Sequence, residues 1–137
     1  MCFVSAAELS EKEDCVLIAG STEEYKDLNS KKGSPILASL RVDSNLGYVN
    51  HMQFDPHFGS FLNMSKLRNR DIYCLTAFGG LFVVSYVQEL FNIEKVIRLG
   101  HNDLIYDAKF LDLRGDRVVS VGNRNGRYQI NEIETGL

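Results

Sequence analysis

The sequence lacks a surplus of positive charge and any long hydrophobic run, and these absences argue against two classes of partner. Its 15 Lys and Arg residues stand against 18 Asp and Glu residues, which gives a net charge of −3. A chain of this charge has no basic excess to attract a phosphate backbone or an anionic lipid surface. No uninterrupted apolar run approaches the ~18 residues of a membrane-spanning helix. We therefore expect neither a nucleic-acid partner nor a membrane.

Cysteine is also scarce, and its spacing fits neither a disulfide framework nor a metal site. The three cysteines are Cys2, Cys15 and Cys74, and no two form a C-x-x-C pair. An odd, widely spaced set of this kind is typical of reduced and mostly buried thiols. The first ten residues, MCFVSAAELS, lack the basic and apolar segments of a secretory signal. The sequence therefore predicts an intracellular protein, either cytoplasmic or nuclear.

Recognisable catalytic and metal-binding motifs are missing as well. His51, His57 and His101 do not have the spacing of metal ligands, and none lies in an H-E-x-x-H pattern. The sequence contains no P-loop, no G-x-G-x-x-G and no G-x-S-x-G. We therefore predict a protein that is not an enzyme and that binds no cofactor or metal. An enzyme whose site has no recognisable motif is the less favoured alternative.

The apolar residues that are present form short runs typical of β-strands. β-Branched, aromatic or alternating patterns predict strands at these positions: 15–20, 36–42, 48–54, 72–78, 81–87, 93–99, 104–111, 117–121 and 127–133. Residues 57–71 are mixed and predict a loop with one short extra strand. Residues 5–14 carry only a weak capping-box pattern and predict a short exposed helical turn or a loop. We therefore assign residues 1–14 to an N-terminal extension and residues 15–137 to a single β domain.

Two pairs of residues indicate tight turns between strands. Gly79 and Gly80 separate two strand-like runs and suit a primed hairpin turn. Asn125 and Gly126 form a second such turn. These pairs predict antiparallel hairpins and, in the last third of the chain, an antiparallel meander.

The segment 85–98 has a second interpretation. Tyr86, Leu90, Ile93 and Ile97 fall at helical spacing as well as within strand-like runs. A helix at 85–98 would make the chain a small α+β domain that serves as an adaptor or a dimerisation platform. The periodicity alone leaves both interpretations open.

An internal repeat favours the all-β interpretation. Gly33, Gly80 and Gly126 precede strand-like runs and stand 47 and 46 residues apart, close to the period of a propeller blade. A second comparison pairs residues 41–55 with residues 98–112 at an offset of 57. An insertion within 57–71 would absorb the difference between the two offsets. We expect three blade-like units at about 15–47, 48–99 and 100–137.

The last forty residues resemble those of a WD40-type β-propeller. Gly100-His101 resembles the GH dipeptide of that family, and IYDAKF resembles its first blade strand. VGNRNGRYQINEIETG resembles the second strand, the turn and the third strand, and it contains Gly122 and Gly126. The resemblance implies structural roles for these glycines. It also implies that His101 and Ser120 belong to a buried hydrogen-bond network.

The sequence departs from the family pattern at four positions. Asn131 stands where the family has tryptophan, and Glu132 stands where it has aspartate. The turn carries Arg124 and Asn125 where acidic residues are frequent. These departures make the third unit a degenerate blade.

The resemblance implies a non-enzymatic protein–protein interaction scaffold. A blade takes about 40–45 residues and closed propellers have 4–8 blades, so 137 residues supply about three. We therefore expect an incomplete β-propeller that is a subunit or a fragment of a larger assembly. Its open sheet edges would be closed by protein partners or by self-association.

Overall fold

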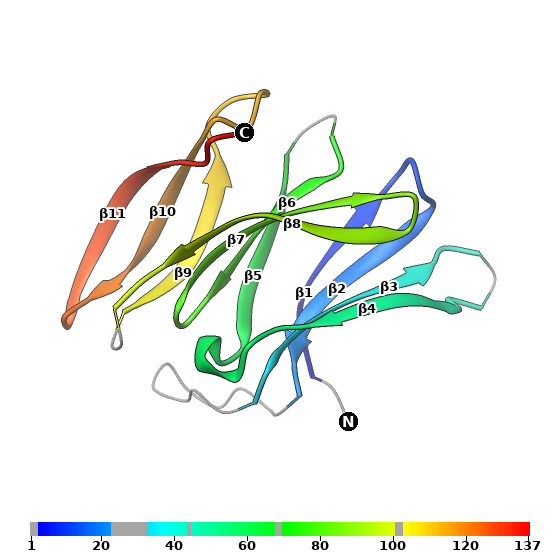
Figure 1. Ribbon diagram of the computed structural model, residues 1–137, viewed down its shortest axis with the longest axis horizontal. Coiled ribbons are helices and arrows are strands. Elements are labelled where there is room, and N and C mark those ends of the chain that lie inside the picture. The colour runs from blue at the N-terminus through cyan, green and yellow to red at the C-terminus, as the bar shows by residue number, and fades with distance from the viewer. Residues whose placement is uncertain (1–2, 23–32, 44, 68–69, 101–102) are drawn as a thin grey trace.

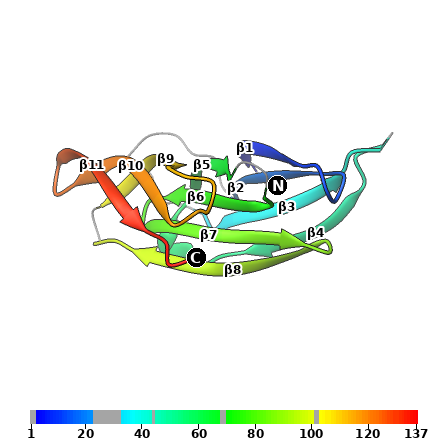
Figure 2. The same cartoon turned by 90° about the horizontal axis from the view of Figure 1, so that it is seen from above.

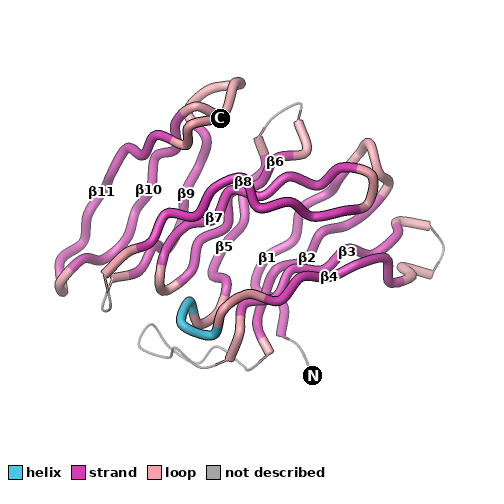
Figure 3. Tube along the Cα trace, in the orientation of Figure 1, coloured by secondary structure: helices cyan, strands magenta, loops and turns pink. Residues whose placement is uncertain are grey.

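The computed structural model describes residues 3–22, 33–43, 45–67, 70–100 and 103–137. Within them the chain forms eleven β-strands and one short 3-10 helix, η1 (Pro56–Phe58). Figure 1 shows the strands in chain order, and Figure 3 shows how few of the described residues are helical. No helix in this part of the chain is long and apolar enough to cross a membrane.

The strands form three antiparallel sheets, each a meander of consecutive strands. The first sheet consists of β1 (Phe3–Ser10), β2 (Cys15–Ser21), β3 (Pro35–Arg41) and β4 (Tyr48–Gln53). The second sheet consists of β5 (Phe61–Lys66), β6 (Ile72–Ala77), β7 (Gly80–Val87) and β8 (Leu90–Arg98). The third sheet consists of β9 (Leu104–Phe110), β10 (Arg117–Arg124) and β11 (Arg127–Glu134). The expectation of a mainly β fold built from blade-like antiparallel sheets is therefore confirmed.

The alternative of a helix at 85–98 is wrong, because strands β7 and β8 occupy this segment. The two strands pair from Gly80↔Arg98 to Val87↔Leu90. Tyr86 lies opposite Phe91, and their ring centroids are 4.6 Å apart. The helical spacing in the sequence is a coincidence, because Tyr86 and Ile97 lie on opposite faces of the sheet and pack into different cores.

The helical turn or loop expected at 5–14 is also wrong, because most of this segment is strand β1. The strand pairs with β2 from Phe3↔Ser21 to Ser10↔Cys15. The hydroxyl of Ser5 donates to the carbonyl of Phe61, 2.5 Å away, and so joins β1 to the second sheet. Several side chains of β1 are exposed, and its sequence therefore lacks the alternation of apolar and polar residues that would have indicated a strand. Residues 3–10 therefore belong to the first sheet and are not an extension.

The sheets also correct the boundaries expected for the blade-like units. Strand β4 pairs with β3 and thus belongs to the first sheet. The units expected at 15–47, 48–99 and 100–137 are replaced by sheets spanning 3–53, 61–98 and 104–134. Gly33 and Gly126 precede the third strand of their sheets and Gly80 begins it, as the repeat predicts. The comparison of 41–55 with 98–112 is wrong, because it matches the fourth strand of one sheet with the first strand of another.

The three sheets stack in chain order, with the second sheet in the middle. Its side chains alternate between two cores, as expected of strands that are covered on both faces. One core joins it to the first sheet and contains Leu17, Leu37, Phe61, Tyr73 and Phe82. The other core joins it to the third sheet and contains Cys74, Leu81, Val83, Ile105 and Val118. We call the face of a sheet that lies toward the preceding sheet its front face, and the opposite face its back face.

The sheets fan out from a row of neighbouring first strands. Strands β1, β5 and β9 provide most of the contacts between sheets. Figure 2 shows these three strands along one side of the molecule and β8 along the other. Strands β4 and β11 lie toward opposite ends in the same view. This arrangement leaves the front face of the first sheet and the back face of the third sheet at the two ends of the stack.

Candidate interaction surfaces

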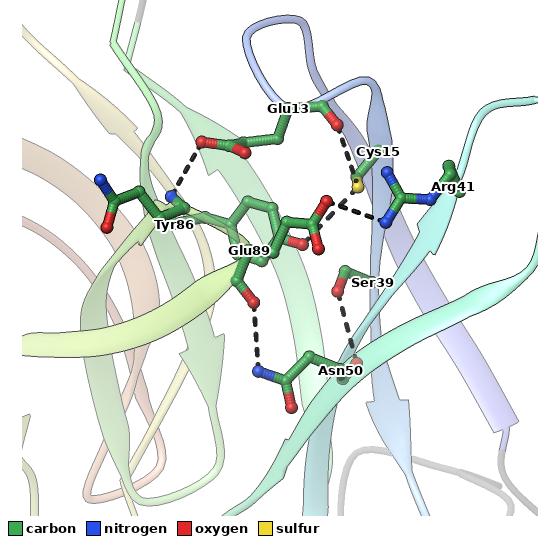
Figure 4. Close-up of polar contacts among 8 residues, drawn as sticks. Glu13, Cys15, Ser39, Arg41, Asn50, Tyr86 and Glu89 are labelled. Atoms are coloured by element: carbon green, nitrogen blue, oxygen red, sulfur yellow. Dashed lines mark hydrogen bonds and ion pairs between the residues drawn. The ribbon is translucent and has the colours of Figure 1, made fainter.

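The junction between the first and second sheets is held by polar contacts around the β7–β8 turn (Figure 4). Arg41 on β3 donates to the carboxylate of Glu89 at 2.8 Å, and the side chain of Asn50 donates to the carbonyl of Glu89 at 3.2 Å. The carboxylate of Glu13 accepts a hydrogen bond from the backbone N–H of Gln88 at 2.8 Å. Three segments of the first sheet therefore bind one turn of the second.

The β7–β8 turn has a backbone conformation that its residues do not favour. Gln88 and Glu89 have φ values of 53° and 63°. A two-residue primed turn requires positive φ at both positions, and asparagine and glycine meet this requirement at the least cost. The contacts with Glu13, Arg41 and Asn50 all bind this pair of residues. We infer that the junction, rather than local preference, holds the turn in this conformation.

Two buried tyrosines in the first core and one buried cysteine in the second core are held in their neutral forms. The hydroxyl of Tyr86 donates to the sulfur of Cys15 at 3.6 Å, and burial raises the pKa of Tyr86 to about 12. Burial likewise raises the pKa of the Cys74 thiol to about 12. Burial and the hydrogen bond to Asp71 hold the pKa of Tyr73 well above its usual range. Cys15 and Cys74 are free and buried, as the sequence predicts, whereas Cys2 lies outside the described residues.

The junction between the second and third sheets is held mainly by strand β9. The hydroxyl of Ser65 donates to the carbonyl of Ala108 at 2.8 Å, and that of Thr76 donates to the carbonyl of Tyr106 at 3.3 Å. Ser65 and Thr76 lie on β5 and β6, the strands nearest to β9. The first strands of all three sheets are therefore linked in series, because Ser5 makes the corresponding contact from β1 to β5.

The glycines predicted from the hairpin do not form a primed turn. Neither Gly79 nor Gly80 has a positive φ, and Gly80 is the first residue of β7. A Cβ atom on Gly80 would lie 2.1 Å from the carbonyl oxygen of Ile97 on β8. Glycine is required here because the neighbouring backbone approaches so closely. The hairpin itself is confirmed by the pairing of β6 with β7.

The other predicted glycines have separate roles. Asn125 and Gly126 have φ values of 53° and 80°, so the second predicted turn is confirmed. A Cβ atom on Gly122 would lie 2.2 Å from the carbonyl oxygen of Leu104. The backbone N–H of Gly100 donates to the carboxylate of Asp103 at 3.2 Å. Gly122 and Gly126 therefore fix the second strand and the turn of the third sheet.

The buried network implied by the resemblance can be followed only in part. Ser120 is buried, and its hydroxyl donates to the carbonyl of Asn131 at 3.5 Å. His101 lies outside the described residues. The loop before β9 is joined to the β10–β11 turn by Asp103, which accepts from the backbone N–H of Asn125 at 3.1 Å. Arg124 lies 3.5 Å from the same carboxylate. An acidic residue on one loop thus contacts a turn that carries an arginine.

A small cavity lies beside the position that matches the family's tryptophan. It is partly open to solvent and has a cavity volume of about 40 Å³, and Ser120, Asn131, Leu104, Ile105 and Asp103 contribute to its lining. Asn131 is itself exposed. Sequence reasoning identified Asn131 as a departure but did not anticipate a cavity.

The back face of the third sheet is an exposed apolar surface. Tyr128 and Ile130 are each 77% exposed, and Val121 on the neighbouring strand is 39% exposed. The ring of Tyr106 lies 6.1 Å from that of Tyr128. Arg117 and Glu132 also lie on this face and pair with each other at 2.7 Å. We call Val119, Val121, Tyr128 and Ile130, with the pair Arg117–Glu132, the open back face.

The front face of the first sheet is the second exposed apolar surface. Val4 is 60% exposed, and it lies on the same face as Val16, Ile18 and Leu40, which are half-buried. We call these four residues, together with Tyr48, the open front face. Both surfaces consist of apolar residues on strands, and the sequence did not indicate that these residues would be exposed. Phe61 and Phe91, by contrast, are buried in the first core.

The described residues show no cluster of histidine, cysteine, aspartate or glutamate that could hold a metal ion. Asp112 uses its carboxylate to accept backbone hydrogen bonds from Gly115 and Asp116 within its own loop.

In comparisons with known proteins, no family model and no curated protein matches this chain.

Proposed function

We propose that the chain is a non-enzymatic protein–protein interaction scaffold of WD40-like propeller type. One observation carries this proposal: apolar positions that are buried between sheets in the middle of the stack are exposed at its two ends. Contiguous exposed apolar surface on a protein of this size marks a site of association. The proposal assigns no cofactor and no metal to the chain.

The three sheets repeat the same pattern of paired positions, and a comparison of equivalent positions shows which exposed residues are unusual. Val4, Phe61 and Ile105 are equivalent, because each lies opposite a small residue of the second strand, Gly20, Ala77 or Gly122. Phe61 and Ile105 are buried against the preceding sheet, whereas Val4 is 60% exposed. Val4 is therefore exposed because no sheet among the described residues covers it, not because of the nature of the position.

The same comparison applies to the other end of the stack. The register between the second and third strands makes Ile130 equivalent to Leu37 and Leu81. Leu37 and Leu81 are buried against the following sheet, whereas Ile130 is 77% exposed. Burial of one such side chain contributes roughly 1.5–3 kcal/mol. Each end of the stack therefore offers apolar area that a protein partner can cover.

An intracellular location, cytoplasmic or nuclear, is part of this proposal. The free thiols of Cys15 and Cys74 support it, because unpaired cysteines are common in reducing compartments.

Differential co-purification tests the proposed function. Tagged wild-type chain, Ile130→Arg and Leu113→Arg are compared in cells that express the protein naturally. Leu113 is also an exposed apolar residue, at 58%, but it lies in the β9–β10 loop outside both open faces. We expect the control to retain the proteins that bind the wild type and Ile130→Arg to lose some of them. An identical set of bound proteins for all three chains would overturn the proposal.

A further inference from the structure

We propose that the partner of each open face is a second copy of this chain, and that two copies form a closed twofold dimer of six sheets. The open back face of one copy covers the open front face of the other, and the twofold axis repeats this contact. This inference rests on the proposed function and names its partner.

The packing inside the chain defines how such a contact is made. In both internal interfaces, the back face of one sheet packs against the front face of the next. The exposed faces at the two ends are a front face and a back face, so one copy displays both halves of the same kind of interface. A front face against a front face would not reproduce either of the internal contacts.

The local geometry of the first strands is the same in all three sheets. Each strand pair has a register shift immediately after the equivalent residue, next to Val4, Phe61 and Ile105. β-Bulges of this kind re-aim a strand and increase its twist. Because the first sheet shares this feature with the second and third, its front face has the shape that receives a preceding sheet.

The chemistry of the two open faces is complementary. Val4, Val16, Ile18 and Leu40 form an aliphatic front face, and Tyr128 and Ile130 contribute large side chains to the back face. The first internal core also combines aliphatic and aromatic side chains, but there the back face is aliphatic, with Leu17 and Leu37, and the front face is aromatic, with Phe61 and Phe82. Arg117 and Glu132 on the open back face pair with each other at 2.7 Å, and Asp107, Lys109 and Glu134 lie on the same face of the sheet. The partner therefore needs an apolar surface opposite Tyr128 and Ile130, with polar groups around it.

The arrangement of the sheets allows both contacts at once. The sheets fan out from β1, β5 and β9, and Figure 2 places β4 and β11 at opposite ends of the molecule. Rotation by half a turn about an axis beside these first strands brings each open face of one copy to the opposite kind of face of the other. Six sheets lie within the range of 4–8 blades found in closed propellers.

Sedimentation velocity over a range from low micromolar to several hundred micromolar chain tests this inference. We expect the mass to rise from the 15.5 kDa of one chain to twice that value and no further. Ile130→Arg and Val4→Arg should each weaken dimerisation at least tenfold, whereas Leu113→Arg should not. Tyr128→Glu serves as a second back-face variant, and circular dichroism verifies that every variant is folded.

A mixture of two variants distinguishes the proposed contact from other symmetric ones. A dimer of one Ile130→Arg chain and one Val4→Arg chain contains one interface in which both residues are unchanged. We therefore expect the mixture to dimerise more strongly than either variant alone. If Val4→Arg has no effect, the third sheets contact each other and the inference is wrong. Larger assemblies would contradict the closed dimer.

The outcomes also separate this inference from the proposed function. A wild-type chain that stays monomeric at every concentration overturns the dimer. The same chain still supports the scaffold function if Ile130→Arg, but not Leu113→Arg, loses bound proteins in cells.

Discussion

At the residue scale, the sheets depend on glycines where two backbones approach closely. Gly20 and Gly122 are such positions, and each faces the carbonyl oxygen of a residue at the start of its sheet's first strand, Phe3 or Leu104. A Cβ atom would lie 1.7 Å from the first of these oxygens and 2.2 Å from the second. Because both contacts are with backbone, no side-chain rearrangement can relieve them.

Gly122→Ala is therefore expected to lower the free energy of unfolding by about 2–3 kcal/mol, the usual cost of overpacking a rigid site. Gly47→Ala is the matched control, because a Cβ atom there meets nothing within 4 Å and the residue has no positive φ. We expect the control to stay within about 0.5 kcal/mol of the wild type. Urea unfolding measures both values, and equal losses in the two variants would show that the close approach is not the cause.

Gln88 gives a second prediction, on backbone conformation. Its φ of 53° favours glycine over any other substitute. Gln88→Gly should be more stable than Gln88→Ala by about 1 kcal/mol, since a residue with a Cβ atom is strained in this region. At the neighbouring Val87 the order should reverse, because glycine weakens an ordinary strand position. If alanine is better than glycine at both residues, the turn does not have the described conformation.

Cys74 gives a prediction on pH. Its folded-state pKa of about 12 lies above the ordinary value of 9.0. The folded state therefore keeps the proton in the range where the unfolded chain has released it. The contribution to stability is complete below about pH 9 and is lost as the pH rises toward 12. Stability should thus fall more steeply between pH 9 and 11 in the wild type than in Cys74→Ala, and identical slopes in urea unfolding would contradict the buried neutral thiol.

At the scale of elements, the sequence was informative wherever an apolar run and a turn signal coincided. The run from Ile72 and the run from Leu81 are apolar on both faces, and they form the two central strands of the middle sheet. Strand β1 could not be found in this way, because it has exposed side chains at positions where a complete stack would cover them. Its pairing with β2 and its link to β5 are contacts between distant residues, which local patterns do not report.

The cavity beside Asn131 tests the resemblance to WD40-type blades. If this residue occupies the position of the family's tryptophan, Asn131→Trp should cover the small cavity with an apolar ring and raise the free energy of unfolding by up to about 1 kcal/mol. Glu132→Trp is the control, since its side chain lies on the opposite face of β11 and cannot reach the cavity. Urea unfolding of both variants is the measurement. A loss of stability in Asn131→Trp with no change in the control would remove this position from the resemblance.

At the scale of the whole molecule, the order of the sheets follows from the alternation of side chains within the second sheet. Tyr73 and Leu75 lie in one core and Cys74 lies in the other. A strand that is apolar on both faces predicts a covered sheet, and the sequence indicated this. Which faces would remain exposed could not be predicted, because Val4 and Ile130 are aliphatic residues, as are their buried equivalents Ile105 and Leu37. Only their position at the ends of the stack makes them different.

Amide hydrogen exchange of the dilute chain, measured by mass spectrometry, tests this stack most directly. Exchange is slowest where opening requires disruption of the core. We predict the slowest exchange in β6 and β7, which are covered on both faces, and faster exchange in β11, whose back face is open and whose outer edge has no paired strand among the described residues. Protection of β11 equal to that of β6 and β7 in the monomeric chain would contradict the account.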